Sequence, residues 1–275
     1  MMGLTGQSRL AGIIGWPVAY SRSPRLHNHW LARHGVDGAY VPLPVQPGRL
    51  VAAVRGLQAT GFVGANVTLP FKVEVMALCD ELSPAAHQIG AVNTLIFTPG
   101  GIIGDNTDGV GFLQNLRASA TPGPGPALLL GAGGAARAIA AAFLNEGRAV
   151  IICNRTPGRA EALRDALPGL TLLPWEYRSA ALAEAAVLVN TTSLGMTGKG
   201  DLVIDLVTAR PDLVVVDIVY APLITPLLQD AAARGHATVG GLGMLLHQAV
   251  PGFAAWFGVT PVVDSATVAL MSGPG

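Results

Sequence analysis

The sequence predicts an α/β fold with two domains, and three observations support this prediction. Short apolar segments alternate with stretches of helical period along most of the 275 residues, a pattern typical of βαβ units and a mainly parallel sheet. A glycine-rich turn directly follows one very apolar segment, ALLL. The densest Pro/Gly stretch, TPGPGP at residues 121–126, separates two such series and is interpreted as the region of the domain join.

The first series predicts an N-terminal α/β domain over residues 1–109. Pro24 stands in the first turn of its first helical stretch, where a proline is well tolerated. In chain order we expect a strand at 10–16, a helix at 23–35, a strand at 39–45, a helix at 48–61, a strand at 64–68, a helix at 71–82 and a hairpin over 93–107.

The second series predicts a Rossmann-type dinucleotide-binding domain over residues 110–240. We expect a helix at 108–120 before the Pro/Gly stretch, and after that stretch a strand, glycine turn and helix over 127–147, a strand and helix over 149–167, strands at 186–193 and 213–220, and a helix at 225–235. Two more helical patterns begin near Gly241 and Thr260. Residues 241–275 are therefore expected to form C-terminal helices that return to the first domain.

Composition narrows the classes of function. The formal net charge is zero and the pI is near 7, which argues against nucleic acid or a membrane as partner. Cys79 and Cys153 lie far apart without metal-site spacing, and His27 and His29 lie on different faces of a helical stretch, so no metal is expected. The N-terminus lacks the pattern of a signal peptide. A reducing, cytoplasmic location is therefore expected. The protein is expected to be a monomer or homodimer and to act on a small molecule.

The glycine turn predicts a dinucleotide site. Gly131, Gly133 and Ala136 match the pattern G-x-G-x-x-G/A between an apolar strand and an alanine-rich helix. Glycine permits the tight turn and close approach to a pyrophosphate, which the helix N-terminus attracts. An ordinary strand-to-helix turn is the alternative, and the surrounding strand and helix favour the dinucleotide site.

The end of the next strand indicates which dinucleotide binds. Asn154, Arg155, Thr156 and Arg159 stand there, and no acidic residue does. An acid at this point would bind the ribose hydroxyls of NAD, whereas arginine binds the 2′-phosphate of NADP. The alternative for these arginines is a solvated surface. We therefore expect NADP as cofactor.

Lysine is rare in this chain. Among 17 basic residues only Lys72 and Lys199 are lysines, and lysine, unlike arginine, changes its pKa readily on burial. Lys72, Asn93 and Asp108 fall at the ends of predicted elements, where an open α/β sheet binds ligands. Lys72 with Asp108 would form an acid/base pair for a hydroxyl or carbonyl, although Asp108 could instead cap the following helix. Lys199, in a glycine-flanked loop, is expected to be a solvated charge.

These motifs together resemble the shikimate dehydrogenase family over nearly the full length. The matching segments, in the family's order, are SRSPRLHN, GANVTLPFK, GAVNTL, GDNTDGVGF, GAGGAARA, NRT, NTTSLGM, DIVYAPLITPLL and GLGMLLHQA. The resemblance implies NADP-dependent, reversible reduction of 3-dehydroshikimate to shikimate, in chorismate and aromatic amino acid biosynthesis. Alternatives are a quinate or amino-shikimate dehydrogenase of the same family, or a non-catalytic NADP-binding sensor.

The resemblance also implies roles for particular residues. Lys72 and Asp108 would be catalytic. The substrate would contact Ser21 and Ser23 through its carboxylate, and Thr68, Lys72, Asn93, Asp108, Tyr220 and Gln248 elsewhere; Ser21 and Ser23 could also cap the helix that follows them. The cofactor would contact Gly131, Ala132, Gly133, Gly134, Ala135, Asn154, Arg155, Thr156, Arg159, Thr192, Ser193, Met196, Ile218 and Gly241. Tyr20 stands where the family often has histidine, which bears on substrate preference.

Overall fold

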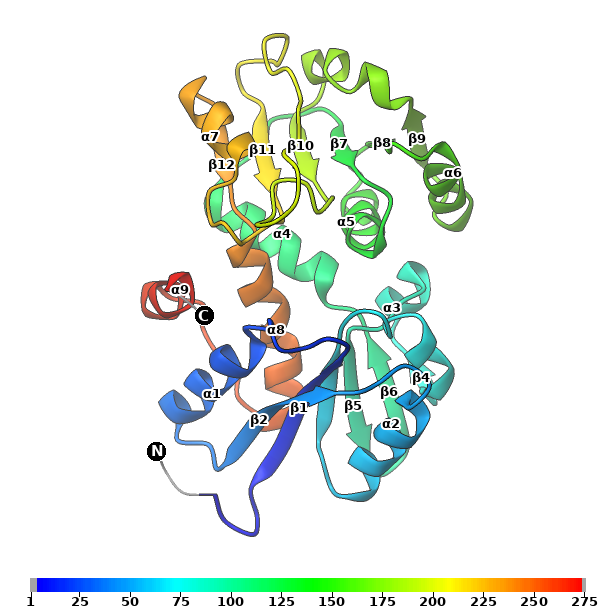
Figure 1. Ribbon diagram of the computed structural model, residues 1–275, viewed down its shortest axis with the longest axis vertical. Helices are drawn as coiled ribbons and strands as arrows, with labels where there is room; N and C mark the ends of the chain where they lie inside the picture. The colour runs from blue at the N-terminus through cyan, green and yellow to red at the C-terminus, as the bar shows by residue number, and fades with distance from the viewer. Residues whose placement is uncertain (1–3, 274–275) are drawn as a thin grey trace. The chain divides into compact units, whose positions relative to one another are not determined.

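The structure, a computed structural model, describes residues 4–273, and the chain divides into two compact units. The first unit comprises the chain up to Thr107 together with the stretch from Gln248 onward, and the second runs from Asp108 to His247. Each unit contains a sheet with helices packed on it (Figure 1), so the predicted α/β class is confirmed.

The first unit has a mixed sheet with the strand order β2-β1-β3-β5-β6-β4. Its strands are β1 (Arg9–Gly15), β2 (Gly38–Pro44), β3 (Gly64–Val67), β4 (Glu81–Leu82), β5 (Thr94–Thr98) and β6 (Gly101–Asp105). Its N-terminal helices are α1 (Ser23–His34), α2 (Leu50–Ala59) and α3 (Pro84–Ile89). β1 pairs in parallel with β2 and β3, whereas β5 and β6 form the predicted antiparallel hairpin.

The helix predicted over residues 71–82 is wrong. The segment forms a short 3-10 helix, η1 (Glu74–Leu78), and then the edge strand β4, which runs parallel to β6. The Lys72 carbonyl accepts a hydrogen bond from the Val92 amide at 2.7 Å, and the Asp80 amide donates to the Ile102 carbonyl at 2.8 Å. Because these bonds tie both ends of the segment to the sheet, tertiary pairing overrides its helical periodicity.

The C-terminal helices complete the first unit. α8 (Leu242–Phe257) begins in the second unit and continues into the first from Gln248, and α9 (Ser265–Ser272) follows it. The indole of Trp256 is buried and donates to the Leu95 carbonyl at 2.9 Å. A Cβ built on Gly64 would lie under 3.0 Å from both groups, so glycine is required where α8 crosses β3.

The second unit contains an all-parallel sheet with the order β12-β11-β10-β7-β8-β9, seen from left to right in Figure 1. Its strands are β7 (Ala127–Leu130), β8 (Val150–Cys153), β9 (Leu170–Leu173), β10 (Val187–Asn190), β11 (Val214–Asp217) and β12 (Ala237–Val239). This is the Rossmann strand order. The first three strands of the unit are added toward one side of the sheet and the last three toward the other, so the order reverses between its first and fourth strands. That switch point lies between β7 and β10.

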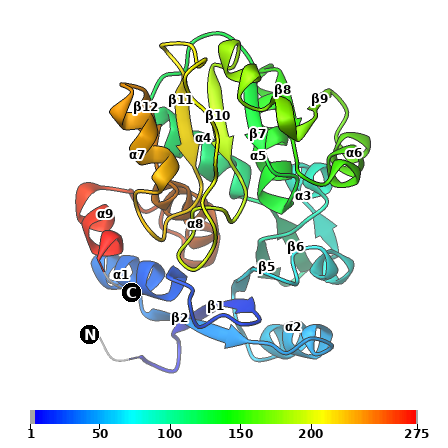
Figure 2. The same ribbon diagram turned by 45° about the horizontal axis from the view of Figure 1, so that its top comes forward.

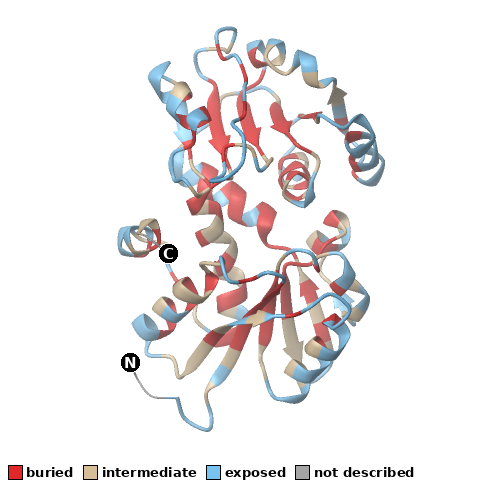
Figure 3. Ribbon diagram, in the orientation of Figure 1, coloured by how far each residue is buried: buried red, intermediate tan, exposed pale blue. Residues whose placement is uncertain are grey.

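Helices and loops lie around the second sheet, as the turned view in Figure 2 also shows. The helices are α4 (Asp108–Ser119), α5 (Gly134–Asn145), α6 (Pro157–Ala166) and α7 (Pro226–Ala233), with 3-10 helices η2 (Trp175–Tyr177) and η3 (Ala180–Ala183). Every residue of β7, β10 and β11 is buried (Figure 3), as expected for parallel strands covered on both faces. Among residues 4–273, no helix combines the length and apolar character that crossing a membrane requires.

The Pro/Gly stretch 121–126 lies within the second unit, between α4 and β7. α4 packs closely on α5: the rings of Phe112 and Phe143 meet edge to face at 5.4 Å. A Cβ on Gly109 would lie 2.9 Å from the Ala138 carbonyl oxygen. Since α4 is held by the second unit, the stretch that follows it connects two elements of one unit.

Gly64→Ala should destabilise the protein by about 1–3 kcal/mol or more, because the new methyl group overlaps Trp256 and the Leu95 carbonyl. Gly56→Ala is the matched control: it lies within α2, and a Cβ there meets nothing within 4 Å. That control should be neutral or stabilising by up to about 1 kcal/mol. Urea unfolding of both variants measures the difference, and equal free energies of unfolding would contradict the packing argument.

Candidate functional site

Several segments that carry polar side chains meet at one end of the central strands of the first sheet, where β1 and β3 finish and β5 begins. β1 and β3 run parallel, so the segments that follow them, carrying Ser21 and Ser23 and then Thr68 and Lys72, leave the sheet at the same edge. β5 runs antiparallel to β3 and pairs Thr94 with Asn66. Asn93, which precedes β5, therefore lies at that edge too.

Ser21 and Ser23 lie at the start of α1. The Ser21 hydroxyl accepts a hydrogen bond from the Ser23 amide at 3.3 Å, and the side chain of Ser23 is buried. The N-cap position is occupied by Arg22, which makes no capping hydrogen bond through its side chain. The Ser21 hydroxyl thus satisfies the first free amide of α1 from outside the N-cap position, which agrees with the capping role considered for it.

Behind the serines a buried hydrogen-bond chain continues through Tyr40. The Tyr40 hydroxyl donates to Asn66 Oδ1 at 2.6 Å, and the Asn66 amide group donates to Thr94 Oγ1 at 3.2 Å. Burial raises the pKa of Tyr40 well above its usual range, and a hydrogen bond from Ser23 opposes that rise. His27 stacks on the Tyr40 ring at 4.0 Å, and burial lowers the pKa of His27 to about 3. The imidazole is therefore neutral and serves as packing.

Asn93 connects three segments of the first unit. Its Oδ1 accepts from the Thr107 amide at 3.0 Å, and its amide group donates to Thr107 Oγ1 at 3.1 Å. Thr107 Oγ1 in turn donates to the Gln248 carbonyl at 2.8 Å. Lys72 is half-buried and its carbonyl pairs with the residue before Asn93. The structure thus places these predicted substrate residues around one edge of the first unit.

Asp108 and Tyr220 belong to the second unit. Asp108 directly follows Thr107, is buried, and lies in the first turn of α4, where a carboxylate complements the helix dipole. Tyr220 is half-buried after β11. Lys199, the other lysine, is exposed in a turn. Within residues 4–273, no group of three or more His, Cys, Asp or Glu side chains is placed to hold a metal ion.

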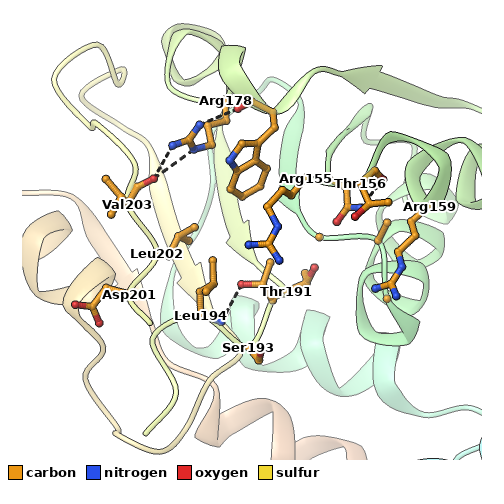
Figure 4. Close-up of a pocket in the computed structure, with 16 residues that line it drawn as sticks. Arg155, Thr156, Arg159, Arg178, Thr191, Ser193, Leu194, Asp201, Leu202 and Val203 are labelled. Carbon is orange, nitrogen blue, oxygen red and sulfur yellow. Dashed lines mark hydrogen bonds between the residues drawn. The ribbon is translucent and has the colours of Figure 1, made fainter. Parts of the chain in front are cut away.

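A cavity of about 500 Å³ opens in the second unit at the carboxyl ends of its strands (Figure 4). Segments after β7, β8 and β10 form its walls, so it lies at the switch point of the sheet. Its lining residues are Gly131, Ala132, Gly133, Asn154, Arg155, Thr156, Arg159, Trp175, Arg178, Thr191, Thr192, Ser193, Leu194, Asp201, Leu202 and Val203.

The glycine turn has the shape that a dinucleotide requires. Gly131 has a φ of +117°, and a Cβ there would lie 2.5 Å from Thr191 Oγ1, so the turn packs directly against the segment after β10. On Gly133 and Gly134, in contrast, a Cβ would meet nothing within 4 Å. The backbone at the N-terminus of α5 is therefore open to a pyrophosphate, and the residues present fit a dinucleotide.

The arginines of this cavity have different environments. Arg155 and Arg159 are exposed and follow β8 (Figure 4). Arg178 stacks on the Trp175 ring, 4.7 Å from its centroid, and donates to the Val203 carbonyl at 2.9 and 3.3 Å. Because Arg178 is occupied in holding the wall, Arg155 and Arg159 are the better candidates for binding phosphate.

The remaining predicted cofactor residues lie outside the cavity lining. Gly134 and Ala135 begin α5, and Met196 is exposed beyond the wall residues. Gly241 is packed against the Ile218 carbonyl, with no room for a Cβ. The sequence reasoning did not identify Trp175, Arg178, Thr191, Leu194 and residues 201–203. Of these, Thr191 had a signal, because it belongs to the polar segment NTTS that ends a predicted strand.

Comparison with known proteins agrees with this arrangement. Residues 13–95 match the family model described as shikimate dehydrogenase substrate binding domain, and residues 124–232 match the model described as shikimate / quinate 5-dehydrogenase. The NADP(+) shikimate dehydrogenase of Acidiphilium cryptum is 62% identical over 96% of this chain and 95% of its own length. That of Rhodospirillum rubrum is 54% identical over 98% and 99%.

A solved structure shows the same fold. The crystal structure of shikimate 5-dehydrogenase from Thermus thermophilus, in complex with NADP(H) and shikimate, superposes with a TM-score of 0.87. The two chains are 37% identical, and the match covers 96% of this chain and 98% of that one. On the matched models, the identities and the coverage, this chain belongs to the shikimate dehydrogenase family.

Proposed function

We propose that this protein is an NADP-dependent shikimate dehydrogenase, which reversibly reduces 3-dehydroshikimate to shikimate. The proposal rests on one observation: the segments that bear Ser21, Ser23, Thr68, Lys72 and Asn93 meet at the end of the first sheet where β1 and β3 finish. Hydroxyl and amide groups both donate and accept hydrogen bonds, which suits a small ring acid with several hydroxyls. The names of the relatives, shikimate dehydrogenase (NADP(+)), support the same reaction.

The roles proposed for the side chains are those that the family resemblance implies, and the chemistry of each side chain suits its role. Ser21 and Ser23 bind the substrate carboxylate, while Thr68, Asn93, Tyr220 and Gln248 hold the hydroxyls. Lys72 and Asp108 hold and move the proton at the oxygen of the reacting carbon, which is general acid–base catalysis. When bound, the cofactor supplies the hydride that this carbon receives.

The cofactor site is proposed on the second unit. The turn from Gly131 to Ala135 would hold the pyrophosphate, and Asn154, Arg155, Thr156 and Arg159 would hold the adenosine ribose and its 2′-phosphate. Thr192, Ser193 and Met196 would line the cofactor site further along, and Ile218 and Gly241 would lie by the nicotinamide. The first unit would be the substrate-binding domain and the second the NADP-binding domain.

We further propose a cytoplasmic location and a monomer or homodimer. Both cysteines are free thiols, and burial raises the pKa of each to about 11. Unreactive free thiols suit a reducing compartment.

Quinate is the second candidate substrate, because the matched family model covers both shikimate and quinate dehydrogenases. Quinate has a tetrahedral carbon bearing an extra hydroxyl where shikimate has a flat one, so its carboxylate leaves the ring at another angle. A site fitted to shikimate would leave a buried polar group unpaired with quinate, at about 1–3 kcal/mol. Tyr20, which is exposed at 59%, is the departure that bears on this choice.

A side-by-side assay tests the function. The protein should oxidise NADPH with 3-dehydroshikimate, use NADH much less well, and reduce NADP with shikimate in the reverse direction. We expect kcat/KM for shikimate to exceed that for quinate by at least about tenfold. Equal or better use of quinate would assign the sister activity, and no turnover with either substrate would refute the proposed function.

Lys72→Met should lower kcat by about 10²–10⁴, the usual contribution of a positioned acid or base. Methionine keeps most of the side-chain length and loses the ammonium group, so folding and NADP affinity should stay near those of the wild type. The matched control is Lys199→Met, which changes the exposed lysine and should leave kcat unchanged. Near-normal turnover of Lys72→Met would exclude the catalytic role.

Arg155→Asp should weaken NADP far more than NAD, because an acid at this position repels the 2′-phosphate and can accept hydrogen bonds from ribose hydroxyls. Arg164→Asp is the control: it makes the same charge change on α6 at an exposed position outside the cavity lining. The ratio of kcat/KM for the two cofactors is the measurement. An unchanged ratio in Arg155→Asp, or an equal shift in the control, would defeat the assignment.

A further inference from the structure

A carboxylate outside the proposed chemistry lies fully buried in the second unit. Asp217 ends β11, and none of its surface is exposed. Its Oδ1 accepts from the Val219 amide and from the Asn190 amide group, both at 3.0 Å. Its Oδ2 accepts from the Thr225 hydroxyl at 2.7 Å. Burial raises the pKa of Asp217, against the effect of these three donors.

Asn190, on the neighbouring strand β10, links Asp217 by hydrogen bonds to the segment that follows that strand. Asn190 ends β10 and is also fully buried. Its amide nitrogen donates to Asp217 Oδ1 and to the Leu194 carbonyl, each at 3.0 Å. Its Oδ1 accepts from the Thr192 amide at 3.0 Å and from the Thr192 hydroxyl at 2.7 Å. Every polar atom of this side chain therefore has at least one partner.

The acceptor atoms of Asp217 decide which way the Asn190 amide faces. If the amide were turned over, its oxygen would face Asp217 Oδ1 and its nitrogen would face the Thr192 N–H, and neither contact would be a hydrogen bond. With the amide held in place, the Thr192 hydroxyl donates to Asn190 and accepts from the Leu194 amide at 3.1 Å. The backbone from 190 to 194 is thus fixed by a chain of hydrogen bonds that begins at Asp217.

The fixed segment is a wall of the cavity. Thr191, Thr192, Ser193 and Leu194 all line it, and Thr191 donates to the Leu130 carbonyl at 2.7 Å, just before the glycine turn. A shift of this segment would therefore change the cavity and the packing of Gly131 together.

We propose that Asp217 is the positioning residue of the cofactor site, acting through Asn190 on residues 191–194. The proposal rests on the proposed function for the identity of the ligand, NADP. It does not require Asp217 to touch the cofactor, and it assigns the effect to the position of its oxygen atoms rather than to its charge.

The distinction between position and charge gives a matched pair of variants. In Asp217→Asn the side-chain oxygen can remain opposite Val219 and Asn190. The new amide nitrogen would then face the Thr225 hydroxyl, which can accept as well as donate. Asp217→Asn should keep NADP affinity within about twofold of the wild type. Asp217→Ala removes all three acceptor contacts and should lose roughly ten- to a hundredfold.

The experiment measures two quantities on each purified variant: the Kd for NADP by titration calorimetry, and amide hydrogen exchange at Thr192 and Leu194 without ligand. Asp217→Ala and Asn190→Ala should each weaken binding and raise exchange at both amides by at least about tenfold. The double variant should lose no more than the worse single variant, because both changes break one chain of contacts. Leu182→Ala, a fully buried core residue of the same unit outside the cavity lining, controls for general destabilisation and should leave Kd unchanged.

The outcomes separate the two proposals. Unchanged Kd and exchange in Asp217→Ala, additive losses in the double variant, or equal losses in Leu182→Ala would each overturn the positioning role. If Asp217→Asn lost as much affinity as Asp217→Ala, the effect would come from the charge of Asp217, and the positioning role would also be overturned. If the wild type bound no NADP, the proposed function would fail, and the exchange rates would still decide the positioning role. If Asp217→Ala did not fold, Asn190→Ala would decide the role, and unchanged Kd and unchanged exchange at Thr192 and Leu194 in that variant would overturn it.

Discussion

Buried side-chain amides complete the hydrogen bonding at the ends of both sheets, and the proposed sites depend on them. Where a strand stops, its last polar groups no longer have a neighbouring strand, and an unpaired buried group costs about 1–3 kcal/mol. Beyond the strand ends, the Thr107 amide donates to Asn93 Oδ1 and the Thr192 amide donates to Asn190 Oδ1, and within β3 the Asn66 amide group donates to the Asn93 carbonyl. All three asparagines are at least 95% buried. An amide both donates and accepts without carrying a charge, so it can serve there at little desolvation cost.

The sequence predicted those features whose signals are local. The glycine turn between β7 and α5, the arginines after β8 and most of the strands and helices were predicted from adjacent residues, whereas the short elements β4, α3, β9 and β12 were not. The helix expected over 71–82 failed because Val92 and Ile102, distant in sequence, bind the backbone at its two ends. Val203 was missed for the same reason: it enters the cavity wall through a hydrogen bond with Arg178, which lies 25 residues away in sequence. Asn190 precedes a polar turn in sequence, and nothing there reveals that its partner is Asp217.

Arginine serves two different purposes around the cavity, and the contacts distinguish them. Arg178 donates to the carbonyls of Val203 and Trp175 and stacks on an indole, so its donors are directed to the protein. Arg155 and Arg159 are exposed beside the turn. A planar guanidinium with several fixed donors suits both tasks. The number of arginines in a site therefore says little about its ligand. What matters is how many of their N–H donors are not already bound to carbonyl groups of the protein.

The placement of the four tryptophans gives the protein two separate optical reporters. Trp30 and Trp256 are buried in the aromatic cluster of the first unit with His27 and Phe253, and Trp16 is partly exposed in the same unit. Trp175 is the single tryptophan of residues 108–247, and it lies in the cavity wall with a guanidinium on its face. Fluorescence changes confined to Trp175 would follow events at the cavity, whereas the emission of Trp30 and Trp256 would follow the core of the first unit. A protein with Trp175 replaced by phenylalanine would separate the two signals in one spectrum.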